Sequence, residues 1–180
     1  MSWHTAVTAA LLCAATAAQA EVVDPSPSGF LSRHETTVNT SPANAYKVLV
    51  GEVGSWWNPA HSYTNDRANL SLDPRPGGCF CERLPNGGGV QHLQVVYAAP
   101  GQSLRMTGAL GPLQGSGVAG SMTWKFTPVP AGTRVDLTYS VGGYLQGGFE
   151  KMAPGVDFVV GEQLNRFSSY IETGRPVAPK

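Results

Sequence analysis

Charge is scarce in this sequence, and neither sign dominates. Asp, Glu, Lys and Arg make up 13% of its 180 residues, and 12 basic residues balance 12 acidic ones. A chain without excess positive charge has no electrostatic attraction to nucleic acid or to an anionic membrane surface. After residue 20 no apolar run is long enough to span a bilayer. We therefore expect neither a nucleic-acid partner nor an integral membrane anchor in the mature chain.

Motifs of several common enzyme classes are also missing. The sequence has no Gly-x-Ser-x-Gly elbow, and Gly115-Ser116-Gly117 is better interpreted as a flexible loop. No glycine-rich loop precedes a helix in the context that phosphate binding requires. The sequence thus argues against a nucleophile-elbow hydrolase and against nucleotide binding, and it predicts no cofactor.

Cysteine is rare, and two of the three cysteines, Cys79 and Cys81, stand two apart on a predicted strand. Residues two apart on a regular strand have Cα atoms about 7 Å apart, at the edge of what a disulfide spans. We therefore favour reduced structural thiols. A disulfide, which export would favour, and a metal or redox role with His61, Glu82 or His92 as further ligands remain open. A lone Cys-x-Cys pair is a weak metal motif, so no metal site is assigned.

The N-terminus has the form of a signal peptide. Residues 6–18 are small and apolar but too short to anchor in a bilayer, and Ala18-Gln19-Ala20 fits a signal-peptidase site. We expect cleavage after Ala20 and a periplasmic or secreted protein. Residues 21–29, with Pro25 and Pro27, should form an extended leader with little reason to pack, and residues 175–180 a C-terminal tail.

The rest of the chain, with 22 Gly and 14 Pro in the whole sequence, has the composition of a turn-rich β protein. After a strand at 30–39, Ser41-Pro42 is a strong helix start, and Gly54 should end that helix before a short turn of helix at 55–58. Strands are then expected at 68–72, 79–84, 90–98, 103–110, 118–128 and 133–144. A long helix should cover 154–173.

The last two strands alternate between an apolar and a polar face, so something must cover their apolar side. The long helix supplies that cover with a stripe at steps of three and four: Val156, Val160, Leu164, Phe167 and Ile171. The sequence predicts one α+β domain over residues 30–174. In it, a strongly curved antiparallel sheet wraps around the C-terminal helix, and two short helices follow the first strand.

This order of elements, with several short motifs, resembles the START-type helix-grip superfamily, also called SRPBCC. It is similar in particular to the heat-shock-ATPase-activator-like and polyketide-cyclase-like branch. The motifs that carry the resemblance are Trp56-Trp57, His61-Ser62-Tyr63, Pro76-Gly77-Gly78, Glu82, Pro100-Gly101, Trp124 and Gly161-Glu162-Gln163-Leu164. The resemblance implies a cavity between sheet and helix that holds an apolar or amphipathic molecule. It implies no single activity, because members bind lipids, cyclise polyketides, carry ligands or assist chaperones.

Glu82, His92 and His61 are the candidate acid–base residues. If Glu82 shares the inner face with Phe80, it becomes a buried carboxylate with a raised pKa, suited to be a general base or a ligand anchor. In the other register Glu82 faces solvent, or pairs with a nearby arginine, and we favour that interpretation. His92 lies in a run with polar residues at alternate positions, and His61 lies at the expected cavity mouth. For both, a histidine satisfied by backbone or solvent is the favoured alternative.

Aromatic side chains form either core or cavity lining, and the sequence does not separate the two. The candidate ligand-binding residues are Trp56, Trp57, His61, Tyr63, Glu82, His92, Met106, Trp124, Tyr139 and Phe158. The glycine-rich segment 108–120 is either a mobile lid over the pocket or a plain flexible hairpin.

The leading hypothesis is an exported protein that binds a small apolar or amphipathic molecule. The first alternative is a cyclase- or hydrolase-type enzyme that uses Glu82 or His92 as general acid or base, with His61 assisting. The second is a metal- or redox-responsive protein that uses Cys79 and Cys81. The sequence makes no prediction of the oligomeric state.

Overall fold

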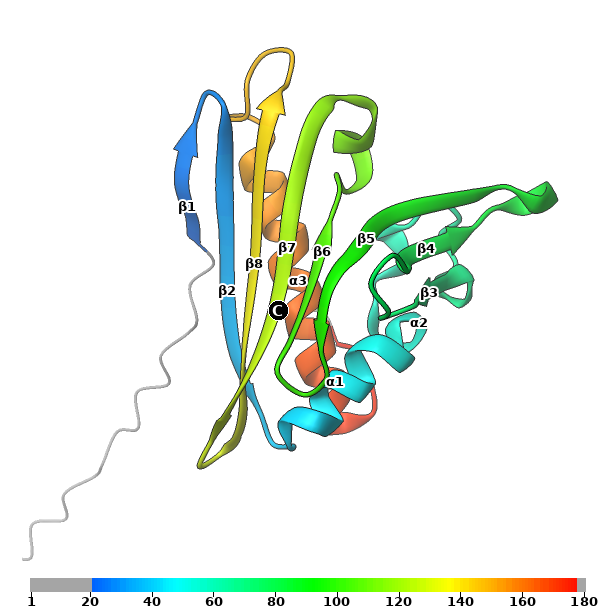
Figure 1. Cartoon of the computed structure of the whole chain (residues 1–180), viewed down its shortest axis with the longest axis vertical. Helices are drawn as coiled ribbons and strands as arrows, with labels where there is room; N and C mark the ends of the chain where they lie inside the picture. The colour runs from blue at the N-terminus through cyan, green and yellow to red at the C-terminus, as the bar shows by residue number, and fades with distance from the viewer. Residues whose placement is uncertain (1–20, 178–180) are drawn as a thin grey trace, which may run out of the picture.

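A computed structural model describes residues 21–177, which form one eight-stranded antiparallel sheet and a long C-terminal helix. The expected signal peptide and the last three residues of the tail lie outside the described residues. The strand order is β1-β2-β8-β7-β6-β5-β4-β3. Figure 1 shows β2, β8 and β7 side by side in front of α3, while β5, β4 and β3 swing away from them. The predicted α+β helix-grip fold is confirmed.

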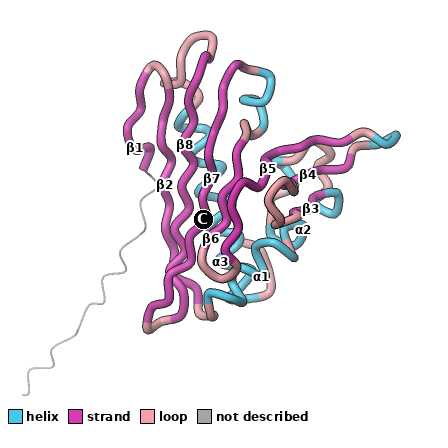
Figure 2. The backbone as a smooth tube through the Cα atoms, in the orientation of Figure 1, coloured by secondary structure: helices cyan, strands magenta, loops and turns pink. Residues whose placement is uncertain are grey.

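Seven of the eight observed strands, β2 to β8, correspond to predicted strands. They are β1 (Glu21–Ser26), β2 (Gly29–Val38), β3 (Leu70–Leu72), β4 (Cys79–Arg83), β5 (Gly89–Ala99), β6 (Ser103–Thr107), β7 (Gly117–Val129) and β8 (Gly132–Tyr144). The helices are α1 (Pro42–Gly51), α2 (Val53–Trp56) and α3 (Ala153–Thr173), with 3₁₀ turns at η1 (Pro59–His61), η2 (Arg67–Asn69), η3 (Pro85–Gly87) and η4 (Gly111–Gly115). Figure 2 shows short helical segments, in cyan, in the connections next to the strands.

The first helix begins and the last helix ends at the capping residues that the sequence predicted. The Oγ of Ser41 accepts a hydrogen bond from the N–H of Asn44 at 3.3 Å, and Pro42 opens α1. At the other end of the chain, Gly174 closes α3 in the left-handed conformation, with φ at 71°. One boundary differs. The first helix ends at Gly51 rather than at Gly54, and Gly54 lies inside the separate short helix α2.

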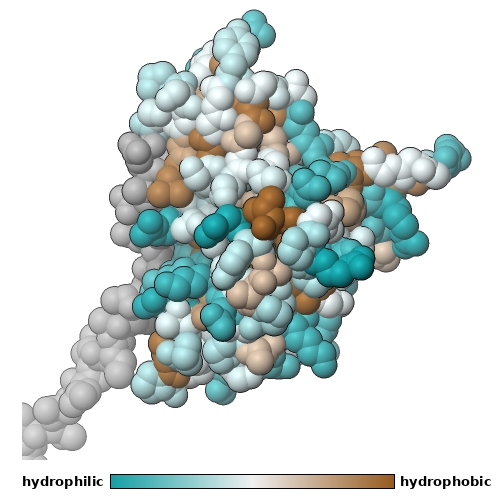
Figure 3. Space-filling view, in the orientation of Figure 1, coloured by the Kyte–Doolittle hydropathy of each residue, from teal (hydrophilic) through white to brown (hydrophobic). Residues whose placement is uncertain are grey.

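The core lies between α3 and the inner faces of the central strands. Trp124 of β7 packs against Phe167 of α3 with ring centroids 5.4 Å apart, and Trp56 of α2 contacts both rings. On the face seen in Figure 3, apolar residues are scattered among polar ones. No helix in the described part of the chain is long and apolar enough to cross a membrane.

The expected leader is instead partly an edge strand. Residues 21–26 form β1, which pairs antiparallel with β2. The pairing is irregular between Val23 and Ser26, where Pro25 lies. Because proline has no N–H to donate, such an irregularity at a sheet edge is where a strand can accommodate it. The unpaired edge of β2 would otherwise expose a row of backbone groups, which gives this segment a reason to pack.

A β-bulge interrupts the pairing of β4 with β5. The cysteines at this position differ from their prediction. Phe80 pairs with Leu93 but Cys81 pairs with Gln91, so β5 contains one extra residue, His92. At the same irregularity the Cα atoms of Cys79 and Cys81 are 5.4 Å apart, and a disulfide joins them. The prediction of reduced thiols was wrong because it assumed a regular strand.

With both sulfurs in the disulfide, Cys79 and Cys81 are not available as metal-binding thiolates. Within residues 21–177, no group of three or more His, Cys, Asp or Glu side chains is placed to hold a metal ion.

A buried polar cluster ties α3 to β2. The Oγ of Ser32 donates to Oδ1 of Asp157 at 2.6 Å, and Nε2 of His34 lies 2.9 Å from the same oxygen. Gly161 faces the His34 ring one turn further along α3. A Cβ atom at Gly161 would lie 2.6 Å from Cε1 of His34. The absence of a side chain at Gly161 therefore allows the helix to approach the sheet this closely.

Replacing Gly161 with alanine should destabilise the protein by about 1–3 kcal/mol, because the added methyl group forces α3 away from His34. Gly155→Ala on the same helix is the matched control. No atom lies within 4 Å of a Cβ there, so this variant should be slightly more stable than wild type through helix propensity. Urea unfolding measures both changes. Equal stability of Gly161→Ala and wild type would contradict the close packing.

Candidate functional site

A cavity of about 530 Å³ opens beside the first turns of α3. Its other walls are the segment 57–63, the loop at 110–112 and one residue of β5. Ten lining residues are apolar or glycine: Trp57, Ala60, Leu110, Gly111, Pro112, Met152, Gly155, Val156, Val159 and Val160. Four are polar: His61, Ser62, Tyr63 and His92. The cavity is thus an apolar space with a small set of polar groups, which is typical of a small-molecule site.

The wall formed by residues 57–63 is fastened to α3 by hydrogen bonds. The backbone N–H of Asn58 donates to Oε1 of Gln163 at 2.8 Å, and its Nδ2 donates to Oε1 of Glu162 at 2.6 Å. Nε1 of Trp57 donates to the carbonyl of His61 at 3.0 Å, which closes the turn. The lining residues of this segment are therefore held at a fixed distance from the helix.

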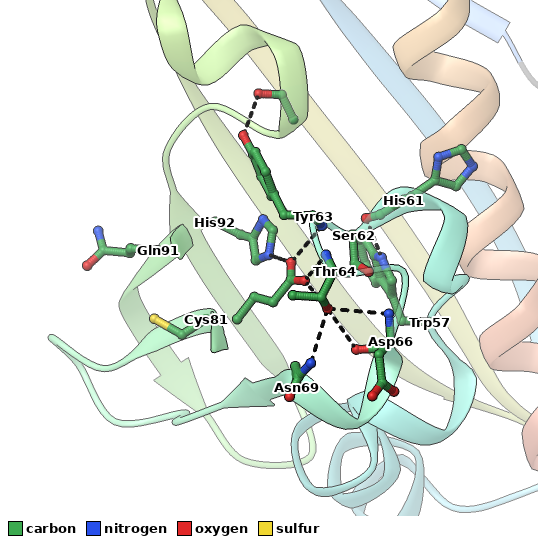
Figure 4. A network of polar contacts seen from close by, with 12 residues as sticks. Trp57, His61, Ser62, Tyr63, Thr64, Asp66, Asn69, Cys81, Gln91 and His92 are labelled. Carbon is green, nitrogen blue, oxygen red and sulfur yellow. Dashed lines mark hydrogen bonds and ion pairs between the residues drawn. The ribbon is translucent and has the colours of Figure 1, made fainter. Parts of the chain in front are cut away.

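Glu82 lies inside and is 2% exposed, so the favoured prediction of a solvated or arginine-paired carboxylate was wrong. Four groups donate to it: the N–H of Tyr63 at 3.0 Å, the N–H and Oγ1 of Thr64 at 2.7 and 2.6 Å, and Nε2 of His92 at 3.0 Å. Figure 4 shows this network. Burial alone would raise the pKa of Glu82, but these hydrogen bonds outweigh it and lower the pKa. The raised pKa expected for a buried Glu82 is therefore also incorrect.

His92 stands between Glu82 and the cavity. It is 5% exposed, and its ring lies against Phe80, with centroids 4.8 Å apart, and near Tyr63, at 5.9 Å. Burial lowers the pKa of His92, and the neighbouring Glu82 carboxylate only partly opposes that effect. At neutral pH the pair is thus an ionised carboxylate and a neutral imidazole. Since the carboxylate only accepts, we assign the imidazole proton to Nε2, which leaves Nδ1 unprotonated.

His61 forms a second histidine–glutamate pair on the opposite wall. Its Nε2 lies 2.8 Å from Oε2 of Glu162, a buried side chain of α3. The structure therefore places two histidines on one cavity, each with a carboxylate behind it. Sequence reasoning did not single out Glu162 or the helix residues Asp157 and Gln163 as site residues. Asp157 had a usable signal, because it precedes Val160 by three residues and so continues the apolar stripe.

The ten predicted ligand-binding residues divide into three groups by their position. Trp57, His61, Tyr63 and His92 line the cavity, and Glu82 lies directly behind His92. Trp56, Met106, Trp124 and Tyr139 are buried in the core and do not line this cavity. Phe158 is 65% exposed on the outer side of α3 and does not line it either.

The glycine-rich segment 108–120 takes part in the cavity wall. It forms η4 and the start of β7, Leu113 is buried, and residues 110–112 face the cavity. The Oη of Tyr63 donates to Oε1 of Gln114 at 3.0 Å, and Nε2 of Gln114 donates to the carbonyl of Gln91 at 2.8 Å. This bridge joins η4 to the opposite wall, and a neighbouring groove shares Tyr63 and His92 with the cavity.

Protonation of His92 should make stability depend on pH. The folded pKa of His92 lies below its ordinary value of about 6.5, so the unfolded chain takes up the proton first as the pH falls. Wild type should therefore lose stability between pH 7.5 and 5.5, by at most about 1.4 kcal/mol per pH unit from this one proton. His92→Gln should be less stable at pH 7.5 but lose less on acidification. Urea unfolding across this range checks it, and parallel pH profiles would contradict the assignment.

No family model and no curated protein matches this sequence. Its fold is shared by solved structures. A conserved protein of unknown function from Enterococcus faecalis has a TM-score of 0.61 at 14% identity, covering 87% of this chain and 79% of that one. A Chromobacterium violaceum protein has a TM-score of 0.57 at 15% identity, covering 79% and 96%. The Aha1 dimer from Colwellia psychrerythraea has a TM-score of 0.51 at 17% identity, covering 80% and 97%. At these identities the likeness shows the helix-grip fold alone.

Proposed function

We propose that this chain is an exported protein that binds a small apolar or amphipathic molecule in the cavity beside α3. The observation that carries the proposal is the cavity itself, about 530 Å³ in volume and lined mainly by apolar side chains. Small-molecule sites commonly measure about 300–1,000 Å³ and have a few polar groups that orient the ligand.

The apolar lining would supply most of the affinity. Removing about 200 Å² of apolar ligand surface from water contributes about 5 kcal/mol before the costs of association are subtracted. The four polar lining residues would fix the orientation of the ligand. This division of roles favours a molecule with one polar end over a uniformly polar one.

Export is supported by two independent features. The first is the small, apolar segment before Ala20, which has the form of a signal peptide. The second is the disulfide between Cys79 and Cys81, since disulfides persist mainly in oxidising compartments. Export also argues against the chaperone-assisting role that the resemblance to the heat-shock-ATPase-activator-like branch would allow.

A second function, general acid–base catalysis on the bound molecule, is favoured by one observation. Glu82 and His92 lie 3.0 Å apart, and His92 borders the cavity. A carboxylate that orients a neutral imidazole is the arrangement that lets histidine accept a proton from a bound molecule. In that case Glu82 would be a positioning residue and His92 the base.

Filling the cavity should abolish binding. Val156→Trp places a large ring into the cavity, whereas Phe158→Trp changes an exposed position on the same helix. In a thermal-shift screen of apolar and amphipathic compounds, wild type and Phe158→Trp should be stabilised by the same compounds. A ligand at 100 times its Kd contributes about 2.7 kcal/mol. Val156→Trp should show no shift.

The outcomes of this screen, and the fate of the ligand after incubation with the protein, test the proposal. Equal shifts for Val156→Trp and wild type, or no shift with any compound, would contradict a ligand site in this cavity. A ligand recovered unchanged after incubation supports a carrier. A ligand converted to product by wild type but not by His92→Gln supports the enzyme.

The export proposal predicts the mature form. Full-length protein expressed in bacteria should appear outside the cytoplasm, with an intact mass that begins at Glu21 and is lower by two hydrogens than the mass with free thiols. Replacing Ala18 with tryptophan should block cleavage and serves as the control. Cytoplasmic protein that retains residues 1–20 would contradict export.

A further inference from the structure

We infer that the polar end of the ligand is a neutral hydroxyl group, phenolic in the best case, which donates a hydrogen bond to Nδ1 of His92. This inference rests on the proposed function and gives the chemical class of the molecule that the cavity takes.

The first step is the free acceptor on His92. Nε2 of His92 is bonded to Glu82, and within residues 21–177 Nδ1 has no hydrogen-bond partner. The buried polar side-chain atoms without a partner in that part of the chain are Tyr46 Oη, Trp56 Nε1 and Thr127 Oγ1. Nδ1 is not among them, so it is not sealed in the core. His92 lines the cavity and also the neighbouring groove, and we take the accessible Nδ1 to face the cavity.

The second step is the direction of the hydrogen bond. Glu82 receives hydrogen bonds from two backbone N–H groups and a hydroxyl besides His92, so its oxygens act as acceptors throughout. The imidazole proton is thereby held at Nε2, and Nδ1 presents a lone pair. An acceptor in this position matches an O–H on the ligand. An ether or ketone oxygen has no hydrogen to donate, so its lone pairs would be repelled by the lone pair of Nδ1.

The third step is charge. Of the described residues that line the cavity, none is lysine or arginine, and the buried carboxylates of Glu82 and Glu162 stand behind its two histidines. A carboxylate headgroup would therefore be desolvated without a cation to receive it. A permanently charged ammonium group would face a mainly apolar lining. A neutral donor avoids both costs.

The fourth step is the shape of the lining next to His92. The Phe80 ring lies 4.8 Å from the His92 ring and also 4.8 Å from the Trp57 ring. Trp57 and His92, which both line the cavity, are thus only one aromatic ring apart. A ligand whose hydroxyl is hydrogen-bonded to His92 shares the cavity with the Trp57 ring. An aromatic body can pack against that ring, which makes a phenol the favoured class.

Three probes of matched size test the inference: 4-butylphenol, its methyl ether 4-butylanisole, and 4-butylbenzoate. Titration calorimetry should show the phenol binding about 10-fold more tightly than the ether, as expected for one hydrogen bond to a buried acceptor. The benzoate should bind more weakly than both. In His92→Phe the preference for phenol over ether should disappear, while binding of the ether is retained.

A spectroscopic measurement on the wild-type protein avoids dependence on the folding of that variant. Long-range ¹H–¹⁵N NMR should show His92 as the neutral Nε2–H tautomer. Its Nδ1 signal should move on addition of the phenol and stay in place on addition of the ether. Observation of the Nδ1–H tautomer would overturn the inference.

The probes also separate this inference from the proposed function. If the ether or the benzoate binds as tightly as the phenol and Val156→Trp blocks it, the cavity site stands and the hydroxyl preference is wrong. If none of the three stabilises the protein at saturation, both the hydroxyl preference and the cavity site for such molecules are overturned.

Discussion

The cavity wall depends on one buried carboxylate. Glu82 is almost entirely removed from water, and a buried charge is tolerated only when hydrogen bonds or an ion pair compensate for its lost hydration. Here two consecutive backbone N–H groups, a hydroxyl and an imidazole supply that compensation. The two N–H groups and the hydroxyl belong to Tyr63 and Thr64. They therefore fix the conformation of the segment between the tryptophan pair and β3. The Glu82 carboxylate thus fixes the positions of Tyr63 and His92, which line the cavity.

The imidazole reaches Glu82 because β5 contains one extra residue. In a regular strand, neighbours point to opposite faces, so a buried Leu93 would leave His92 outside. The bulge places both inside. At the same irregularity, Cys79 and Cys81 of β4 have Cα atoms 5.4 Å apart and are joined by a disulfide. The extra residue thus places His92 on the inner side, opposite the part of β4 that carries the disulfide.

The fold could be predicted from the sequence, whereas the bulge and the disulfide could not. The apolar alternation in β7 and β8 and the stripe on α3 are repeated many times, so the α+β fold and the strand order along the chain were predictable. The register of β4 was not, because five residues carry too few apolar positions to decide which face is inside. A bulge has no strong sequence signal, and the thiol prediction failed with it. The pairing of His61 with Glu162 joins residues about 100 apart, a distance that local patterns do not report.

The cavity persists because polar contacts, rather than apolar packing alone, determine where α3 lies. A helix held only by apolar side chains would move to fill a neighbouring void, since empty volume costs about 24 cal/mol per Å³. Asp157 and Glu162 are five residues apart and so point about 140° apart around the helix axis. The first is bonded to Ser32 and His34 of β2, and the second to the segment that contains His61. Hydrogen bonds of fixed length on two flanks prevent that movement. Val156, Val159 and Val160, which line the cavity, lie on the wider arc of the helix between these two anchors, and that face therefore stays open to a ligand.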